Sequence, residues 1–342
     1  MVVLDEVFMS LLTKNIFIRA NFVILLNKIK YSMKIVCVEP IGITQERAEK
    51  IKNEFLALGH DFICYMDRKE DEKILKERMH DADVVIISNI RLNAEVLGSS
   101  TKLKMLSVAF TGLDHIDLNY CKEHNIKVSN ASGYATIAVA ELAIGLMIDV
   151  YRHITLLDKE TRNSQTRNNF LGRQIRGKTV GIIGTGAIGI ETAILLKAMG
   201  SNVIAWSRTK KEEALKHNIK YVELQELMRV SDIISLHVPL NEETYHLINK
   251  DLLSLCKKDA ILINTARGNV VDIEALSESL KNGNLAGAGI DVFETEPPLP
   301  EDHPLINLPN CVLTPHIAYA TKEAFDERIE IVMNNIKSWL RS

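Results

Sequence analysis

From Met33 onward, short runs of consecutive apolar residues alternate with longer stretches in which apolar residues recur at helical spacing. Uninterrupted apolar runs are typical of strands that are buried on both faces of a parallel sheet. Strands that alternate with helices indicate the α/β class, in which helices cover both faces of each sheet. The expected strands lie at 35–38, 61–65, 84–88, 104–109, 127–129, 202–206, 233–237, 260–264, 288–292 and 311–314.

Three of the expected helices are defined by their ends or by their apolar faces. One covers 44–58, because Thr44 can cap its N-terminus and Gly59 can end it. A second covers about 137–153 and is apolar over more than one face, which is typical of a buried helix. The last covers about 321–339.

The stretch from Thr179 to Gly200 combines a strand, a glycine-rich turn of the G-x-G-x-x-G pattern and a helix. The first glycine of the pattern permits a tight turn, the second lets the backbone approach a pyrophosphate, and the third lets the helix pack on the strand. The N–H groups at the start of the helix would hold the phosphates. The motif therefore predicts a dinucleotide-binding site. Its expected contacts are Gly184, Gly186, Ala187, Ile188 and Gly189.

Composition narrows the possible partners. A length of 342 residues suggests about two domains. The formal net charge of −3 is too small to favour a nucleic acid or a membrane surface as a partner. The five cysteines are scattered and form no C-x-x-C pair, so we expect reduced thiols, a cytoplasmic protein and no metal site.

Residues 1–32 differ in character from the rest of the chain. They mix apolar residues with basic and amide residues, which interrupts any span long enough to cross a bilayer, and they contain no small-residue cleavage site. We expect Met33 to be the true start and the preceding residues to be a non-native or disordered leader. The alternative is an amphipathic surface helix.

Side chains able to carry chemistry follow three strands of the second half of the chain. Arg267 could bind a carboxylate and polarise a neighbouring carbonyl. Asp291 and Glu296 are hydrogen-bond acceptors, and His316 could give or take a proton near neutral pH. Taken alone, Arg267, Glu296 and His316 are each more simply explained as structural or solvated residues. Because ligands of doubly wound folds bind outside the carboxyl ends of the strands, we expect these side chains at one site.

With these residues in place, the chain resembles the D-isomer-specific 2-hydroxyacid dehydrogenase family. The segments that carry the resemblance are 139–141, 177–189, 237–244, 263–272, 289–297 and 313–317. The resemblance implies two Rossmann- or flavodoxin-like, doubly wound parallel-sheet domains with a cleft between them. The substrate-binding domain would comprise 33–130 and 316–342, and the NAD(P)-binding domain 131–315.

The resemblance also implies a role for individual residues in the reduction of a small 2-oxoacid to a D-2-hydroxyacid. Arg267 would bind the substrate, Glu296 would support the histidine, and His316 would donate a proton to the carbonyl. Asp291 would hold the nicotinamide carboxamide. A loop that contains Phe110, Thr111 and Gly112 would receive the substrate carboxylate. The other expected cofactor contacts are His237, Pro239, Thr244, Thr265 and Ala266. Relatives use the region of the helix at 137–153 in a two-fold interface, so we expect a homodimer.

The second strand of the nucleotide unit departs from the usual NAD pattern. An acid commonly follows the glycines by about 20 residues and binds the ribose 2′-OH. Ser207 occupies that position here, and Arg208, which follows it, could pair with a 2′-phosphate. NADP is therefore favoured over NAD. The alternative is a solvated basic turn in an NAD enzyme that lacks the acid.

Alternatives exist for the substrate and for the function. Glyoxylate, hydroxypyruvate and branched 2-oxoacids are all possible substrates, although Phe110 narrows the substrate loop. The second possible function is a nucleotide-sensing, corepressor-like binding protein without physiological turnover. Such relatives can keep the arginine, the glutamate and the histidine.

Overall fold

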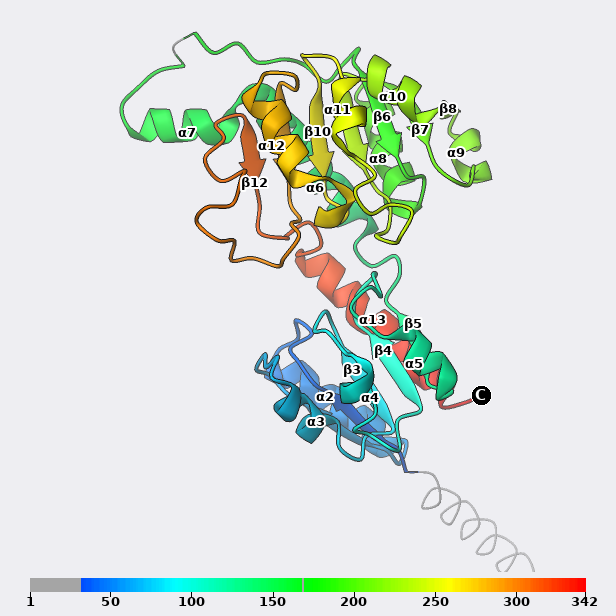
Figure 1. Ribbon diagram of the computed structural model, residues 1–342. Helices are drawn as coiled ribbons and strands as arrows, with labels where there is room; N and C mark the ends of the chain where they lie inside the picture. Colours follow the sequence, from blue (N-terminus) through cyan, green and yellow to red (C-terminus); the bar gives the residue numbers. More distant parts are fainter. Residues whose placement is uncertain (1–31, 168) are drawn as a thin grey trace, which may run out of the picture. The chain divides into compact units, whose positions relative to one another are not determined.

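The computed structural model describes residues 32–167 and 169–342 (Figure 1). Their contacts divide the chain into two compact units. Unit 1 comprises the described residues up to Ser132 together with Glu327–Ser342, and unit 2 comprises Gly133–Asp326. The leader predicted at 1–32 lies outside the described residues except for Ser32.

Unit 1 contains a five-stranded parallel sheet with the strand order β2-β1-β3-β4-β5. The strand order reverses at β1, which pairs with both β2 and β3, as in flavodoxin-like folds. The capping prediction is confirmed, because the Thr44 side chain accepts the N–H of Arg47 and Gly59 has a φ of 87°. The elements are β1 (Lys34–Cys37), α2 (Gln45–Ala57), β2 (Asp61–Cys64), α3 (Glu72–Met79), β3 (Val84–Ile87), α4 (Ala94–Leu97), β4 (Met105–Val108), α5 (Leu118–Glu123), β5 (Lys127–Asn130) and most of α13 (Lys322–Trp339).

Unit 2 contains a seven-stranded parallel sheet with the strand order β12-β11-β10-β9-β6-β7-β8. The order reverses at β6, which pairs with both β7 and β9, and ligands of such sheets bind at this switch point. The strands are β6 (Thr179–Ile183), β7 (Asn202–Trp206), β8 (Lys220–Tyr221), β9 (Ile233–Leu236), β10 (Ile261–Asn264), β11 (Gly287–Ile290) and β12 (Cys311–Leu313). The helices are α6 (Thr136–Arg152), α7 (Ile154–Arg162), α8 (Ala187–Ala198), α9 (Glu212–Lys216), α10 (Leu224–Val230), α11 (Lys250–Ser254), α12 (Ile273–Lys281) and the short 3₁₀ helix η1 (Gly268–Val270).

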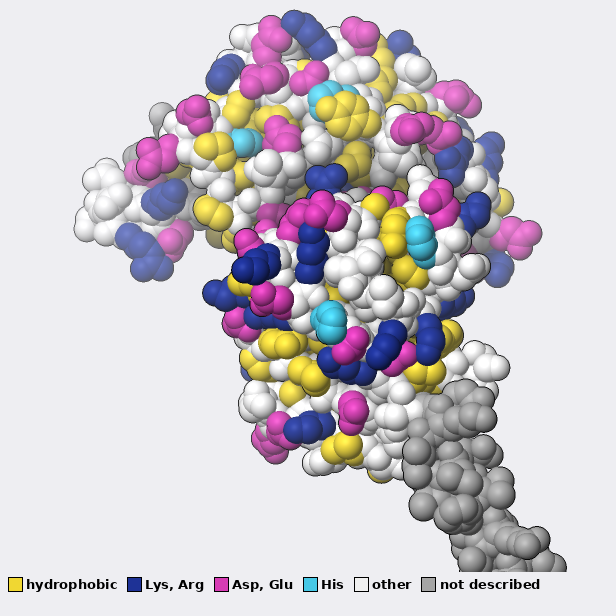
Figure 2. All heavy atoms as spheres, turned by 60° about the horizontal axis from the view of Figure 1, so that its bottom comes forward, with side chains coloured by type: hydrophobic (Ala, Val, Ile, Leu, Met, Phe, Trp, Pro, Cys, Tyr) yellow, Lys and Arg dark blue, Asp and Glu magenta, His cyan; other side chains and the backbone are white. Residues whose placement is uncertain are grey.

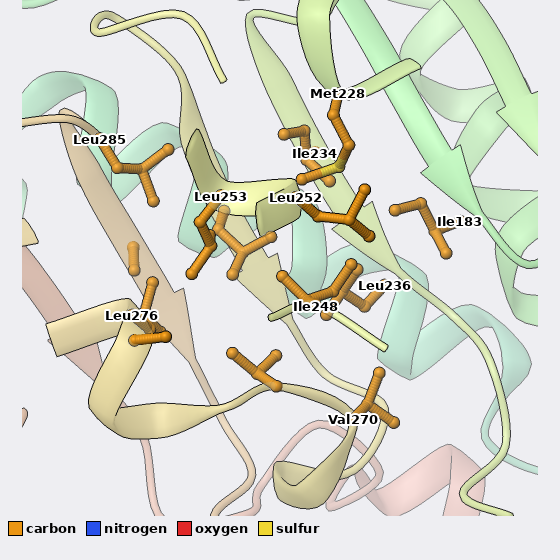
Figure 3. Close-up of a cluster of buried hydrophobic side chains, with 14 of the residues drawn as sticks. Ile183, Met228, Ile234, Leu236, Ile248, Leu252, Leu253, Val270, Leu276 and Leu285 are labelled. Atoms are coloured by element: carbon orange, nitrogen blue, oxygen red, sulfur yellow. The ribbon is translucent and has the colours of Figure 1, made fainter. Parts of the chain in front are cut away.

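Two apolar cores flank the sheet of unit 2. Figure 3 shows the first, in which Met228 of α10 and Leu252 of α11 lie near Ile234 of β9. The second core contains Met147 of α6 and Leu196 of α8. Burial on both faces explains why the strands read as uninterrupted apolar runs. The predicted doubly wound α/β fold is confirmed.

Helix α6 is less completely buried than its sequence suggests. One face packs into unit 2, with Leu146 and Met147 buried, whereas Ile137 is 61% exposed. The helix ends at His153, whose φ of 55° is left-handed, and α7 follows directly. No residue of α7 is buried.

The segment at 316–326, expected with the substrate-binding domain, belongs by its contacts to unit 2. The cause is a set of hydrogen bonds to Asp291 of unit 2. They come from the N–H groups of His316, Ile317 and Ala318. Which unit binds substrate and which binds cofactor stays a prediction.

Charged side chains of both signs are interspersed on the face of the molecule that Figure 2 draws, in agreement with the small net charge. Among the described residues, no helix combines the length and the apolar character needed to cross a membrane.

Candidate active site

The glycine-rich turn leaves β6 at the switch point of unit 2 and leads into α8. Gly184 has a φ of 102°, and a Cβ at this position would lie 2.5 Å from the carbonyl oxygen of His237. A Cβ on Gly189 would lie 2.0 Å from the carbonyl oxygen of Gly184. The packing of the turn itself therefore requires both glycines.

Gly186 differs from these two glycines. A Cβ on Gly186 would meet nothing within 4 Å among the described atoms, and its φ of −73° suits any residue. The fold gives no reason for a glycine here, whereas the close approach of a pyrophosphate does. Helix α8 begins at Ala187 and Ile188, and no side chain of the described residues caps it. Its first N–H groups and the positive end of its dipole suit a phosphate, so the turn fits a dinucleotide.

The turn after β7 contains Ser207 and Arg208. The Arg208 guanidinium is ion-paired with the carboxylate of Glu243, in the loop that follows β9. Both side chains are exposed. Arg208, which was predicted to bind a 2′-phosphate, therefore already has an acidic partner in the structure. Its position in the sequence did not indicate this partner.

Tyr221 of β8 ties this basic turn to the glycine-rich turn. Its hydroxyl accepts the N–H of Lys211 at 2.9 Å and lies 2.7 Å from the hydroxyl of Thr185. Thr185 is buried between Gly184 and Gly186. The two segments expected to hold the cofactor phosphates are thus joined through one tyrosine.

The loop after β9 holds three of the residues expected at the cofactor. Nε2 of His237 lies 2.9 Å from the hydroxyl of Ser235, and burial lowers the pKa of His237 to about 4. The imidazole is therefore neutral at neutral pH. The hydroxyl of Thr244 donates to the carbonyl of Pro239 at 2.6 Å. The backbone N–H of Thr244 donates to the side-chain oxygen of Asn241 at 3.1 Å. These bonds fix the shape of the loop.

The turn after β10 holds Arg267. The buried Asn264 side chain accepts the N–H of Ala266 at 3.0 Å and donates to the carbonyl of Arg267 at 2.9 Å. The half-buried Arg267 guanidinium donates to the carbonyl of Ala266 at 2.8 Å. The Thr265 hydroxyl is buried and has no hydrogen-bond partner among the described residues. Because an unsatisfied buried hydroxyl is costly, a bound ligand is a suitable partner for Thr265.

Asp291 fixes the segment that carries His316. Its fully buried carboxylate accepts the hydroxyl of Thr314 at 2.6 Å and the N–H groups of Ile317 and Ala318, both at 2.9 Å. Its carbonyl oxygen accepts the N–H of His316 at 2.8 Å. His316 has a φ of 54°, which is uncommon for a residue other than glycine, and these bonds hold it there. Burial raises the pKa of the Asp291 carboxyl.

The imidazole of His316 is paired with a carboxylate. Nδ1 of His316 lies 2.9 Å from both carboxylate oxygens of Glu296. The ring also contacts Tyr319 edge to face, at 5.2 Å between centroids. The side chain of His316 is 11% exposed and that of Glu296 is 60% exposed. Because Glu296 engages Nδ1, a proton exchanged with a substrate would be carried by Nε2.

The predicted substrate loop follows β4 in unit 1. Phe110 is buried, and its ring meets His115 edge to face at 6.3 Å between centroids. The carbonyl of Thr111, which precedes Gly112, accepts the side-chain N–H of Asn130 at 2.6 Å. Local contacts thus fix the loop.

Several residues of the site had no role in the sequence interpretation. Asn264 and Thr314 each end an expected strand, so the rule that ligands bind at strand ends could have included them. Glu243 and Tyr221 gave no such signal, because the partner of each lies on another loop.

A dinucleotide turn at the switch point, an arginine at one strand end and a histidine–glutamate pair at others define a nicotinamide-dependent oxidoreductase. Comparison with known proteins agrees. The model of the D-isomer specific 2-hydroxyacid dehydrogenase NAD binding domain matches residues 144–318. The glyoxylate reductase of Thermofilum pendens is 40% identical over 278 residues, which cover 79% of this chain and 81% of that protein. The chain belongs to the D-isomer-specific 2-hydroxyacid dehydrogenase family, as the sequence resemblance predicted.

Solved structures show the same fold. An acyclic imino acid reductase in complex with NADPH and D-Arg has a TM-score of 0.81 at 36% identity, covering 90% of this chain and 97% of that chain. The D-lactate dehydrogenase of Aquifex aeolicus, complexed with NAD and lactic acid, has a TM-score of 0.80 at 29% identity, covering 90% and 95%. The protein is therefore a dehydrogenase that uses a nicotinamide cofactor.

Proposed function

We propose that this dehydrogenase reduces a small 2-oxoacid to the D-2-hydroxyacid, with His316 as the proton donor and NADPH as the preferred cofactor. The observation that carries the proposal is the contact of His316 Nδ1 with both carboxylate oxygens of Glu296. When bound, the reduced nicotinamide supplies the hydride. The protein supplies the proton, the charge and the orientation.

The proton and the negative charge of the substrate are handled by different residues. Nε2 of His316 would protonate the carbonyl oxygen, while Glu296 stabilises the positive charge on the ring before transfer. Asp291 keeps the histidine backbone in its left-handed conformation, which aims the ring. Arg267 would bind the substrate carboxylate, because its planar guanidinium can donate two parallel hydrogen bonds. The backbone near Thr111 and Gly112 stays a predicted carboxylate contact of unit 1.

The preference for NADPH rests on the turn after β7. Ser207 places no negative charge where an acid would repel a 2′-phosphate, and Arg208 supplies a cation. The fold is compatible with either cofactor, because one similar structure binds NADPH and another binds NAD. The 2′-phosphate would have to draw Arg208 away from Glu243.

The substrate class rests on the small substrate named for the glyoxylate reductase relative and on the buried ring of Phe110 in the predicted substrate loop. We also propose a homodimer. On unit 2, the apolar side chain of Ile137 on α6 is exposed and no residue of α7 is buried, so these two helices offer surface that a second copy would cover.

The test is a panel of 2-oxoacids, including glyoxylate, hydroxypyruvate and a branched 2-oxoacid, each with NADPH and with NADH. The loss of reduced-nicotinamide absorbance measures turnover, and chiral analysis identifies the product. We expect turnover of at least one small 2-oxoacid, the D-product, and a higher kcat/KM with NADPH. Tight cofactor binding without turnover of any 2-oxoacid would instead favour the corepressor-like alternative. A higher kcat/KM with NADH would refute the NADPH preference alone.

A further inference from the structure

Both ends of the Arg208–Glu243 ion pair are held in place by their own loops. On the acidic side, the N–H groups of Glu243 and Thr244 donate to the side-chain oxygen of Asn241 at 3.0 and 3.1 Å. These bonds fix the local shape of the loop after β9 around Glu243. The ion pair therefore joins two anchored segments and is not a chance meeting of long side chains on a free surface.

On the basic side, Tyr221 holds the turn. Its hydroxyl accepts the N–H of Lys211 and contacts the hydroxyl of Thr185. The ammonium of Lys210 lies 5.9 Å from the centre of the Tyr221 ring. The position of Arg208 is thus limited by contacts two and three residues away along the chain.

We propose that Glu243 is a specificity-determining residue for the cofactor. Its carboxylate forms an ion pair with Arg208, the cation that would otherwise bind a 2′-phosphate. The proposal rests on the assignment of Arg208 to that phosphate under the proposed function. NADPH must break the ion pair before its 2′-phosphate can bind Arg208. NADH carries no such phosphate, so Arg208 can keep its partner. Glu243 therefore weakens the binding of NADPH relative to NADH.

The size of the effect follows from the exposure of the pair. The Arg208 and Glu243 side chains are 72% and 63% exposed, so water and salt screen their attraction. An exposed ion pair changes an equilibrium by about two- to five-fold. Glu243 thus moderates the preference that Ser207 and Arg208 establish and does not reverse it.

The test compares Glu243→Gln with Glu242→Gln. Both changes remove one negative charge from the same exposed loop, and Glu242 has no ion-pair partner among the described residues. Dissociation constants for NADPH and NADH are measured by fluorescence titration of the full chain without substrate. We expect Glu243→Gln to lower the ratio of the NADPH constant to the NADH constant by about two- to five-fold at low salt, and by less at high salt. Glu242→Gln should leave the ratio nearly unchanged.

A double-mutant cycle with Arg208→Gln separates this inference from the proposed function. In the Arg208→Gln background, Glu243→Gln should no longer change the ratio, because the cation it competes for is gone. An equal effect of Glu243→Gln with and without Arg208, or an equal effect of the two glutamate variants, would overturn the proposal. Wild-type protein that prefers NADH would refute the NADPH preference, yet the ratio measured for Glu243→Gln would still decide the role of Glu243.

Discussion

Substitutions in the glycine-rich turn should distinguish glycines that the fold requires from a glycine that cofactor binding requires. Gly186→Ala adds a methyl group into space that no described atom within 4 Å occupies, at a φ of −73°. Alanine is a poorer N-cap than glycine, which costs about 0.5–1 kcal/mol. The loss of chain entropy in the unfolded state offsets about 0.4–1 kcal/mol of this cost. The free energy of unfolding without cofactor should therefore change by less than about 1 kcal/mol.

Gly189→Ala is the matched comparison. Its methyl group would lie 2.0 Å from the carbonyl oxygen of Gly184, so the backbone of the turn or of α8 has to move. Forced packing of this kind costs about 1–3 kcal/mol. Both variants should bind NADPH at least about ten-fold more weakly, but only Gly189→Ala should also lose stability.

Two measurements decide this prediction. Urea unfolding without cofactor gives the change in the free energy of unfolding, and fluorescence titration gives the dissociation constant for NADPH. Gly186→Ala that binds NADPH like the wild type would refute the assignment of this turn to the pyrophosphate. Equal destabilisation by the two variants would refute the packing argument.

Three further predictions concern the substrate, the pH dependence and the oligomer. Arg267→Lys keeps the positive charge but loses the two parallel hydrogen bonds of the guanidinium. The KM for the 2-oxoacid should therefore rise about ten-fold or more, while the NADPH dissociation constant stays unchanged. An unchanged KM would exclude Arg267 from the carboxylate site. Because burial lowers the pKa of His237 from 6.5 to about 4, the unfolded state takes up a proton that the folded state does not, and stability falls as the pH is lowered through that window. His237→Asn should remove up to about 1.4 kcal/mol per pH unit of this slope in urea unfolding, and an unchanged slope would show that the imidazole is not kept neutral. Light scattering should give twice the chain mass of 38.4 kDa, and Ile137→Glu should shift the mass toward one chain, whereas a monomeric wild type would contradict the proposed interface.

The sequence predicted the strands well, because burial on both faces of a parallel sheet leaves an uninterrupted apolar signature. Even the short β12 was found, since its end is marked by Pro315 and His316. β8 was missed because two residues are too few to form a pattern. α7 was missed because a helix without buried residues carries a mainly polar sequence.

Sequence reasoning predicted those residues of the candidate site that follow the carboxyl ends of the strands. The contact between His316 and Glu296 follows from two adjacent strand ends, β11 and β12, meeting at one edge of the sheet. The use of the Asp291 carboxylate to hold the histidine segment could not be read from the sequence, because it depends on backbone N–H groups. The pairing of Arg208 with Glu243 was equally hidden, because 35 residues separate them.

We propose that His316 delivers the proton when a 2-oxoacid is reduced. His303→Gln provides a matched control, because His303 also meets a glutamate, Glu294, at 3.3 Å in unit 2 without being placed at the site.

The most direct measurement is the single-turnover decay of NADPH absorbance with a saturating 2-oxoacid, for the wild type, His316→Gln and His303→Gln. The rate should fall by about 10²- to 10⁴-fold in His316→Gln, with its NADPH dissociation constant within about two-fold of the wild type, and it should stay near the wild-type rate in His303→Gln. A near-normal rate in His316→Gln, or an equal fall in both variants, would contradict the assignment of His316 as the proton donor.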